Sequence, residues 1–225
     1  MEVRHLSVKV GDENILKDVS FKVEPQALNV IVGKNGVGKT LLLDRLSRLE
    51  DQGEEALIDF PLQKEIVYQT QGVPFIYEAT VEQTIKLIGD LAGGHEIMTS
   101  LPANIAKNLT KPFGKLSSGE KRYVIIWSIL NVDKRLYLLD EPFANLAPSV
   151  IRELTALLYS KVAEGKTIIM TSHQFELLQE KDTHIVVLKE GQVTFEGEMP
   201  EFKKQFQTFQ DLFDDYLWLY NFCSG

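Results

Sequence analysis

The residues from 33 to 40 have the types and spacing of a polyphosphate-binding loop. They read Gly-Lys-Asn-Gly-Val-Gly-Lys-Thr and match the pattern G-x-x-x-x-G-K-[ST] in full. Glycines allow successive backbone N–H groups to turn inward around an anion, and the start of the following helix adds a positive dipole end. We expect Lys39 to reach the β- and γ-phosphates and Thr40 to bind Mg²⁺. The backbone cradle is expected from the six preceding residues, Gly33, Lys34, Asn35, Gly36, Val37 and Gly38.

Two adjacent acids follow a second hydrophobic run. Asp140 and Glu141 come directly after Leu-Tyr-Leu-Leu at 136–139. In proteins with a phosphate loop, the first such acid usually holds Mg²⁺ through water and the second polarises the water that attacks the γ-phosphate. A solvated turn after a core strand is the alternative. The upstream phosphate loop favours the catalytic interpretation.

A third motif opens a helix. Ser117, Ser118 and Gly119 precede an apolar pattern at helical spacing. A serine hydroxyl and the free N–H groups of a helix start can bind an anion. The same residues also form an N-cap with the following glutamate, Glu120, and both interpretations can hold together.

The elements that carry these motifs alternate between strand and helix. Hydrophobic patterning predicts strands at 3–10, 19–23, 28–32, 56–60, 65–68, 136–139 and 167–171, helices at 81–91 and 148–164, and a turn at 11–14. This order predicts an α/β fold with a mostly parallel sheet, preceded by a short antiparallel β-section. Ligands of such sheets lie at the carboxyl ends of the strands, where the three motifs could converge.

Bulk properties narrow the functional class. The chain has 225 residues, 44% of them hydrophobic, and a net charge of −8, which gives no electrostatic footprint for nucleic acid. Its one cysteine, Cys223, forms no internal disulfide and fits a reducing compartment. We expect neither a signal peptide nor a membrane-spanning segment, so action at a membrane would need a partner.

Through these motifs, the chain resembles the nucleotide-binding domains of ABC ATPases. The phosphate loop, the LSSGE run at 116–120, the LLDEP run at 138–142 and the TSH run at 171–173 occur in the family order, and Gln71 fits the family's Q-loop. The resemblance extends to about residue 198. It implies a P-loop NTPase core with an inserted helical subdomain.

The resemblance also implies a mechanism. Two copies would face head to tail, each ATP lying between Lys39 and Thr40 of one copy and the Ser117–Gly119 run of the other. Asp140 would support Mg²⁺, and Glu141 would be the general base. Gln71 would touch Mg²⁺ and the attacking water and link the site to an integral-membrane permease, while His173 would contact the γ-phosphate. ATP would join the two copies until hydrolysis separates them.

Three features depart from the family pattern, and one of them is Ser118 and Glu120 in place of the usual Gly and Gln. Val10 stands about where the family has an aromatic residue that stacks on adenine, so we expect a weaker grip on the base. Ala147 stands where the D-loop usually ends in Asp, which alters the loop that bridges the two sites.

We predict one ABC ATPase domain, with a catalytic core at 1–71 and 117–199, a helical subdomain at 72–116 and a helical tail at 200–225. The tail carries an aromatic stripe, which either packs on its own core or contacts another subunit. The leading functional hypothesis is the ATP-hydrolysing subunit of a membrane transporter, held on the inner face of the cell membrane by separate permease chains. The alternative is a soluble ABC ATPase without a transport role, such as an iron–sulfur cluster assembly ATPase.

Overall fold

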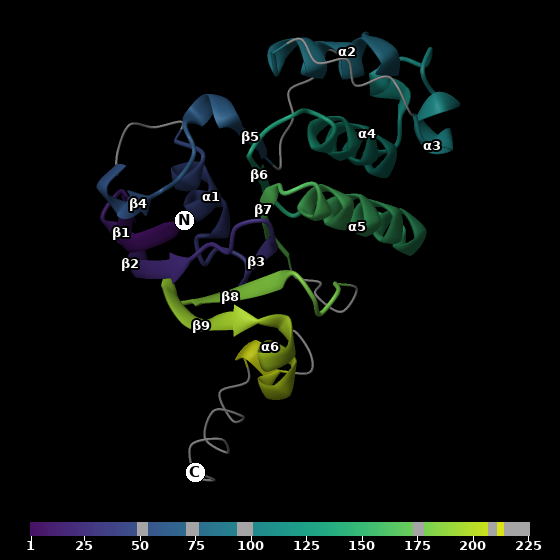
Figure 1. Ribbon diagram of the computed structural model, residues 1–225. Coiled ribbons are helices and arrows are strands. Elements are labelled where there is room, and N and C mark those ends of the chain that lie inside the picture. The colour runs from purple at the N-terminus through teal and green to yellow at the C-terminus, as the bar shows by residue number, and fades with distance from the viewer. Residues whose placement is uncertain (49–53, 71–76, 94–100, 173–177, 207–210, 214–225) are drawn as a thin grey trace.

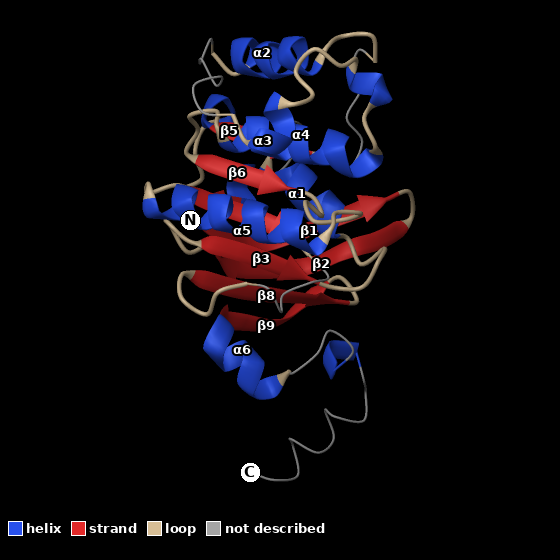
Figure 2. Cartoon of the chain, turned by 90° about the vertical axis from the view of Figure 1, so that its right-hand side faces the viewer, coloured by secondary structure: helices blue, strands red, loops and turns tan. Residues whose placement is uncertain are grey.

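The computed structural model describes residues 1–48, 54–70, 77–93, 101–172, 178–206 and 211–213. Two β-sheets organise this part of the chain, a six-stranded sheet in the order β5-β6-β7-β3-β8-β9 and a three-stranded sheet in the order β2-β1-β4. Helices cover the larger sheet, as Figures 1 and 2 show. The fold is thus of the predicted α/β class.

The larger sheet is parallel except at one edge. Its strands are β3 (Leu28–Val32), β5 (Ile66–Gln69), β6 (Leu136–Leu139), β7 (Thr167–Thr171), β8 (Thr183–Lys189) and β9 (Gln192–Glu198). All neighbouring pairs are parallel except β8 with β9. Every residue of β3, β6 and β7 is buried, as expected of parallel strands covered on both faces. The strands predicted at 28–32, 136–139 and 167–171 are confirmed, and that predicted at 65–68 begins one residue later.

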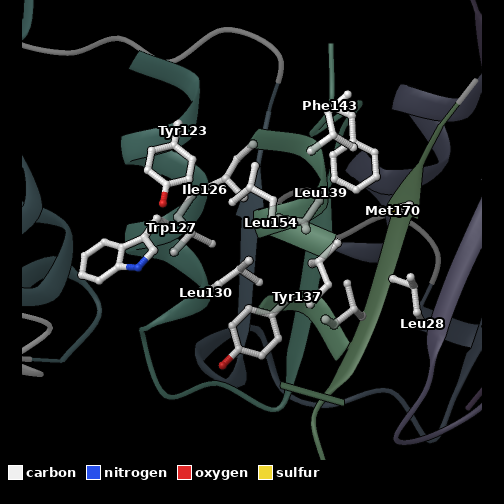
Figure 3. Packing of buried hydrophobic residues seen from close by; sticks show 14 of the residues in the cluster. Leu28, Tyr123, Ile126, Trp127, Leu130, Tyr137, Leu139, Phe143, Leu154 and Met170 are labelled. Carbon is white, nitrogen blue, oxygen red and sulfur yellow. The ribbon is translucent and has the colours of Figure 1, made fainter. Parts of the chain in front are cut away.

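Alternate side chains of these strands point to opposite faces of the sheet and pack into two different hydrophobic clusters. On one face, Tyr137 and Leu139 join the cluster that includes helices α4 (Ser118–Leu130) and α5 (Pro148–Ala163). On the other face, Leu136 and Leu138 join the cluster that includes helix α1 (Lys39–Leu46). Figure 3 shows the first cluster, in which the labelled side chains of α4, α5 and β6 are Tyr123, Ile126, Trp127, Leu130, Leu154, Tyr137 and Leu139.

The smaller sheet is antiparallel and irregular. Strand β1 (Glu2–Val10) matches the prediction, whereas β2 (Glu13–Lys22) begins six residues before the predicted strand at 19. Positive φ angles of 52° at His5 and 58° at Asp18, together with register shifts, break the alternation on which the prediction depended. Strand β4 contains only Leu57–Ile58, shorter than the predicted 56–60.

Helices follow their sequence signals closely. Helix α2 (Val81–Leu91) spans the predicted 81–91, and its first turn is closed by a reciprocal capping box between Thr80 and Gln83. Helix α5 has Pro148 at its first position and ends before Gly165, whose φ is 85°. Within the described part of 72–116, the elements are α2, helix α3 (Ala103–Ala106) and a 3₁₀ turn at Phe113–Lys115, consistent with the helical character predicted there.

The chain after β7 is richer in strand than predicted. Hydrophobic patterning predicts no element between 172 and 199, whereas the structure has strands β8 and β9 there. Helix α6 (Met199–Gln205) and a 3₁₀ turn at Asp211–Phe213 are the described parts of the predicted tail. Phe202 of α6 is fully buried and its ring packs with Phe195 and Phe206, so this part of the aromatic stripe belongs to the domain's own core.

Candidate functional site

The phosphate loop joins β3 to α1 and requires glycine for two different reasons. A Cβ at Gly33 would lie 2.6 Å from the carbonyl oxygen of Leu188 in β8, so this position has no room for a side chain. Gly36 has open space around it but adopts a φ of +80°. The loop therefore combines close packing at its start with a left-handed turn in its middle.

Lys39 lies folded back into this loop. Its ammonium group donates hydrogen bonds to the carbonyl oxygens of Gly33 at 2.8 Å and Lys34 at 3.1 Å, and only 6% of the residue is exposed. Burial lowers the pKa of Lys39, while the charges of Glu141 and Asp140 oppose that shift. The side chain is positioned at the centre of the loop, where a bound phosphate would meet a positive charge.

Asp140 connects three elements at the carboxyl edge of the sheet. The residue is fully buried, and its Oδ2 accepts a hydrogen bond of 2.7 Å from the Thr40 hydroxyl at the start of α1. Its Oδ1 accepts another of 2.7 Å from the hydroxyl of Thr171, the last residue of β7. The structure thus brings Thr40 and Asp140 together across 100 positions of sequence.

The donor set at this point fits a magnesium ion. Thr40 and Asp140 present a hydroxyl and a carboxylate oxygen, the hard ligands that Mg²⁺ binds alongside water and substrate phosphates. Among the residues described, no three His, Cys, Asp or Glu side chains cluster into a metal site of their own. Mg²⁺ commonly completes its coordination with water and substrate phosphates.

Glu141 faces the same space in an uncommon backbone conformation. Its φ is 48°, its N–H donates to the Thr171 hydroxyl at 2.8 Å, and its carboxylate Oε1 lies 3.9 Å from the Lys39 ammonium. Its carbonyl oxygen accepts a hydrogen bond of 2.6 Å from the Arg122 guanidinium. Sequence reasoning missed the partnership with Thr171 and Arg122, although the Thr-Ser-His run was itself noted.

A hollow of about 500 Å³ opens beside the phosphate loop. It is lined by Val10, Ile15, Asn35, Gly36, Gly38, Lys39, Thr40, Leu41 and Glu141. Val10 is 58% exposed here, which suits a residue that packs on a bound base. Ile15 was not foreseen as part of this wall. The hollow thus has a polar floor of phosphate-loop groups and an aliphatic rim.

The Ser-Ser-Gly motif lies at the start of α4 and is engaged in a capping box. The Ser117 hydroxyl and N–H donate to Oε2 of Glu120 at 2.8 and 2.9 Å, and the Glu120 N–H donates back to that hydroxyl at 3.3 Å. Hydrogen bonds from the Ser117 N–H and then from its hydroxyl hold the pKa of Glu120 below its ordinary value. The capping interpretation of this motif is confirmed, and a carboxylate occupies the helix start.

Ser117, Ser118 and Gly119 line a second hollow of about 400 Å³. Asn145, Leu146 and Ala147 form another part of its wall, and Ala147 is the N-cap of α5 without a side-chain capping bond. No described residue lines both this hollow and the one beside the phosphate loop. The phosphate loop and the Ser-Ser-Gly motif therefore line two different hollows of the described chain. Gln71 and His173 lie outside the described residues.

A third hollow, of about 510 Å³, lies between the edge strand β5 and helices α2 and α4. Its wall combines polar residues of 63–70 with Ile88, Leu91, Ile125 and Ile129. Leu91, at the end of α2, is 80% exposed. In the part of the chain that the structure describes, no helix is long and apolar enough to cross a lipid bilayer.

Comparisons with known proteins find relatives that match most of the chain. The family model described as "ABC transporter" matches residues 16–144. An energy-coupling factor transporter ATP-binding protein, EcfA1 of Thermotoga maritima, is 32% identical over 95% of this chain and 88% of its own length. The cytochrome c biogenesis ATP-binding export protein CcmA of a Ruegeria species is 29% identical over 77% of this chain and 84% of its own length.

Solved structures support the fold. A structure described as the ATP-binding subunit of an ABC transporter superposes with a TM-score of 0.77 over 94% of this chain and 97% of its own length, at 23% sequence identity. A nucleotide-free ATP-binding cassette from an ABC transporter gives a TM-score of 0.73 at 21% identity, over 91% of this chain and 94% of its own length. Both similarities extend over nearly the whole length of the two chains compared.

Proposed function

The chain belongs to the ABC transporter family and is an ATPase subunit of that family, and from this premise we propose that it drives a membrane transporter through ATP-dependent dimerisation, with its permease on separate chains. The observation that carries the ATP-hydrolysing part of the proposal is the 2.7 Å contact between Thr40 and Asp140. It joins the phosphate loop to the acid pair in one site with Lys39 and Glu141.

Each residue of this site has a proposed role. The loop from Gly33 to Gly38 and Lys39 hold the triphosphate, and Val10 packs on the base. Thr40 and Asp140 would hold Mg²⁺, which would neutralise charge on the phosphates. Glu141 orients the attacking water. Gln71 and His173 keep the roles that the family resemblance implies, contact with Mg²⁺ and water for the first and with the γ-phosphate for the second.

The separation of the two hollows supports dimerisation. The hollow beside the phosphate loop shares no lining residue with the Ser-Ser-Gly hollow of the same chain. Two copies arranged head to tail would bring the Ser117–Gly119 run of each over the ATP of the other. Two ATP molecules would then join the copies, and loss of the γ-phosphates would release them.

The hollow at β5 supports an apolar permease segment as the second partner. Exposed Leu91 and the neighbouring Ile88, Ile125 and Ile129 offer an aliphatic surface next to polar residues of β5. We propose that a cytoplasmic helix of the permease packs here. The chain would then work on the inner face of the cell membrane, attached through that partner.

The test combines hydrolysis with crosslinking. On a Cys223→Ser background, Asn35→Cys and Ser117→Cys place one thiol in the phosphate loop and one in the Ser-Ser-Gly motif. We expect Mg²⁺–ATP to produce a disulfide-linked dimer, more completely when Glu141→Gln blocks hydrolysis. Asn35→Cys alone is the control and should form no disulfide-linked dimer. A double-cysteine protein that binds ATP without crosslinking would exclude the head-to-tail dimer.

The permease is tested separately. Leu91→Glu should release the chain from membranes of its own host while leaving ATP hydrolysis in solution unchanged, because Leu91 lies away from the nucleotide hollow. Leu87→Glu, at another exposed position of the same helix but outside this hollow, adds the same charge and is the control. If the parent chain is recovered only from the cytosol, with no membrane subunit attached, the soluble alternative replaces the transporter.

A further inference from the structure

Glu141 is held at both ends of its backbone. Its N–H donates to the Thr171 hydroxyl, and its carbonyl oxygen accepts from Nη1 of Arg122 at 2.6 Å. The carbonyl also accepts from the N–H of Ala144 at 3.2 Å in the following turn. A left-handed φ of 48° is unfavourable for a residue with a side chain, so the surrounding contacts must hold Glu141 in place.

Arg122 supplies the charged member of these contacts. A guanidinium N–H is a strong donor with a fixed direction, and the partly buried setting excludes much of the competing water. Rotation of the 141 peptide would break this hydrogen bond and swing the Glu141 carboxylate away from Lys39, 3.9 Å distant. Arg122 therefore restrains the direction in which Glu141 points.

Arg122 lies on the same helix as the Ser-Ser-Gly motif. Helix α4 begins at Ser118, and Arg122 follows one turn later. At the helix start, a Cβ on Gly119 would lie 3.2 Å from the carbonyl oxygen of Asn145, so α4 also packs closely on the loop after Glu141. A displacement of the helix start is thus transmitted to the loop that carries Glu141.

We propose that Arg122 is a positioning residue for Glu141, which sets the carboxylate for water activation and makes its orientation depend on the position of the α4 start. The inference rests on the proposed function, in which Glu141 acts on the ATP of its own chain and α4 contacts the ATP of the other. It gives the chain a direct link between its two half-sites.

Steady-state ATP hydrolysis by the full chain tests this role. Arg122→Met keeps the length of the side chain and removes its donors. We expect kcat to fall on the order of 10- to 100-fold, as misplacement of a catalytic group does, while KM for ATP and the melting temperature remain close to the parent. Arg122→Lys retains one donor and should recover to within about threefold of the parent. Arg152→Met, on the exposed face of α5, is the matched control and should behave as the parent.

A double-mutant cycle shows whether Arg122 acts through Glu141. In a Glu141→Gln background, Arg122→Met should cause no further loss, because the group that it positions is already absent. If Arg122→Met does not fold, Arg122→Gln is used in its place. The Gln side chain remains polar but is too short to reach the carbonyl oxygen of Glu141. The kcat of this variant should fall in the same way.

Parental kcat in the Met or Gln variant, a fall in ATP affinity that accounts for the loss, or additive losses in the cycle would each overturn the inference. These outcomes leave the proposed function standing if Glu141→Gln by itself strongly lowers the turnover of the parent to a residual rate that can be measured. A parent chain that does not hydrolyse ATP would overturn the proposed function, and this inference with it.

Discussion

The Thr171 hydroxyl lies 2.7 Å from Oδ1 of Asp140, at the point where β7 ends beside β6. Both residues are fully buried, and the same hydroxyl accepts the N–H of Glu141. The Thr171 hydroxyl therefore holds two groups in place. One is the Asp140 carboxylate, which faces Thr40, and the other is the backbone N–H of Glu141. This arrangement makes Thr171 the connection between β7 and both members of the acid pair.

Removal of that hydroxyl should affect stability and turnover together. Thr171→Val keeps the side-chain shape but leaves Oδ1 of Asp140 buried without this donor, at a cost of about 1–3 kcal/mol in the free energy of unfolding. We expect kcat to fall as well, and Thr171→Ser to retain most of both. Urea unfolding and ATP turnover measure the two effects. A Val variant equal to the parent in both would show that Asp140 needs no such partner.

Replacement of Glu120 should separate helix stability from dimer affinity. Glu120→Gln removes a negative charge from the α4 start, where the triphosphate of the second copy is proposed to bind. We expect tighter ATP-dependent dimers by sedimentation equilibrium, with the monomer less stable by about 0.3–1 kcal/mol because the helix dipole loses an anion. Glu82→Gln, in the first turn of α2, should lose stability without changing dimerisation. Equal dimer constants for parent and Glu120→Gln would show that the carboxylate does not oppose the nucleotide.

An aromatic residue at position 10 should strengthen nucleotide binding. Val10 is 58% exposed on the rim of the phosphate-loop hollow, so a larger ring fits without repacking the core. Val10→Tyr should lower the dissociation constant for ATP several-fold, since stacking adds about 0.5–1.5 kcal/mol beyond area burial. Leu62→Tyr, at another exposed aliphatic position, is the control. Titration with a fluorescent ATP analogue measures the dissociation constants of both variants. An unchanged dissociation constant in Val10→Tyr would show that the base does not bind next to residue 10.

Stability should fall steeply in alkali. Burial is the first cause that raises the pKa of Tyr68, Tyr123, Tyr137 and Tyr159 above their ordinary value. The unfolded chain therefore deprotonates first, so stability is intact below about pH 10 and is lost as pH rises above it. Tyr137→Phe should weaken the protein at neutral pH, because its hydroxyl donates to Val132 at 2.6 Å, but flatten the alkaline slope. Urea unfolding of both proteins across this pH range measures the effect. If the free energy of unfolding falls with pH equally steeply in Tyr137→Phe and in the parent, Tyr137 does not have this role.

The sequence predicted the sheet best where strands are buried on both faces. Runs such as 136–139 and 167–171 are apolar throughout and stand between clear turns. The predicted strand at 19–23 begins too late, because a bulge at Asp18 interrupts the alternation of apolar and polar residues along β2. Strand β8 carries the same kind of apolar run as β7, and β9 alternates in exposure, so the signals for both were present.

The site could be predicted as far as strand ends determine it. Lys39, Thr40, Asp140 and Glu141 come together because parallel strands deliver their carboxyl ends to one edge. The partnership of Arg122 with Glu141 could not be read in this way. It depends on how α4 packs across the loop after β6, a contact between residues 19 positions apart that no local spacing encodes. Ile15 was missed for a similar reason, because β2 begins earlier than its pattern indicated.

The two glycines described at the start and middle of the phosphate loop should respond differently to selection. Gly33 is confined by the Leu188 carbonyl, whereas Gly36 is limited only by its dihedral angle. A library screened for soluble expression alone should retain glycine at 33 and admit asparagine at 36, which tolerates left-handed backbone. Survivors of that screen would therefore separate the demands of architecture from those of chemistry within a single loop.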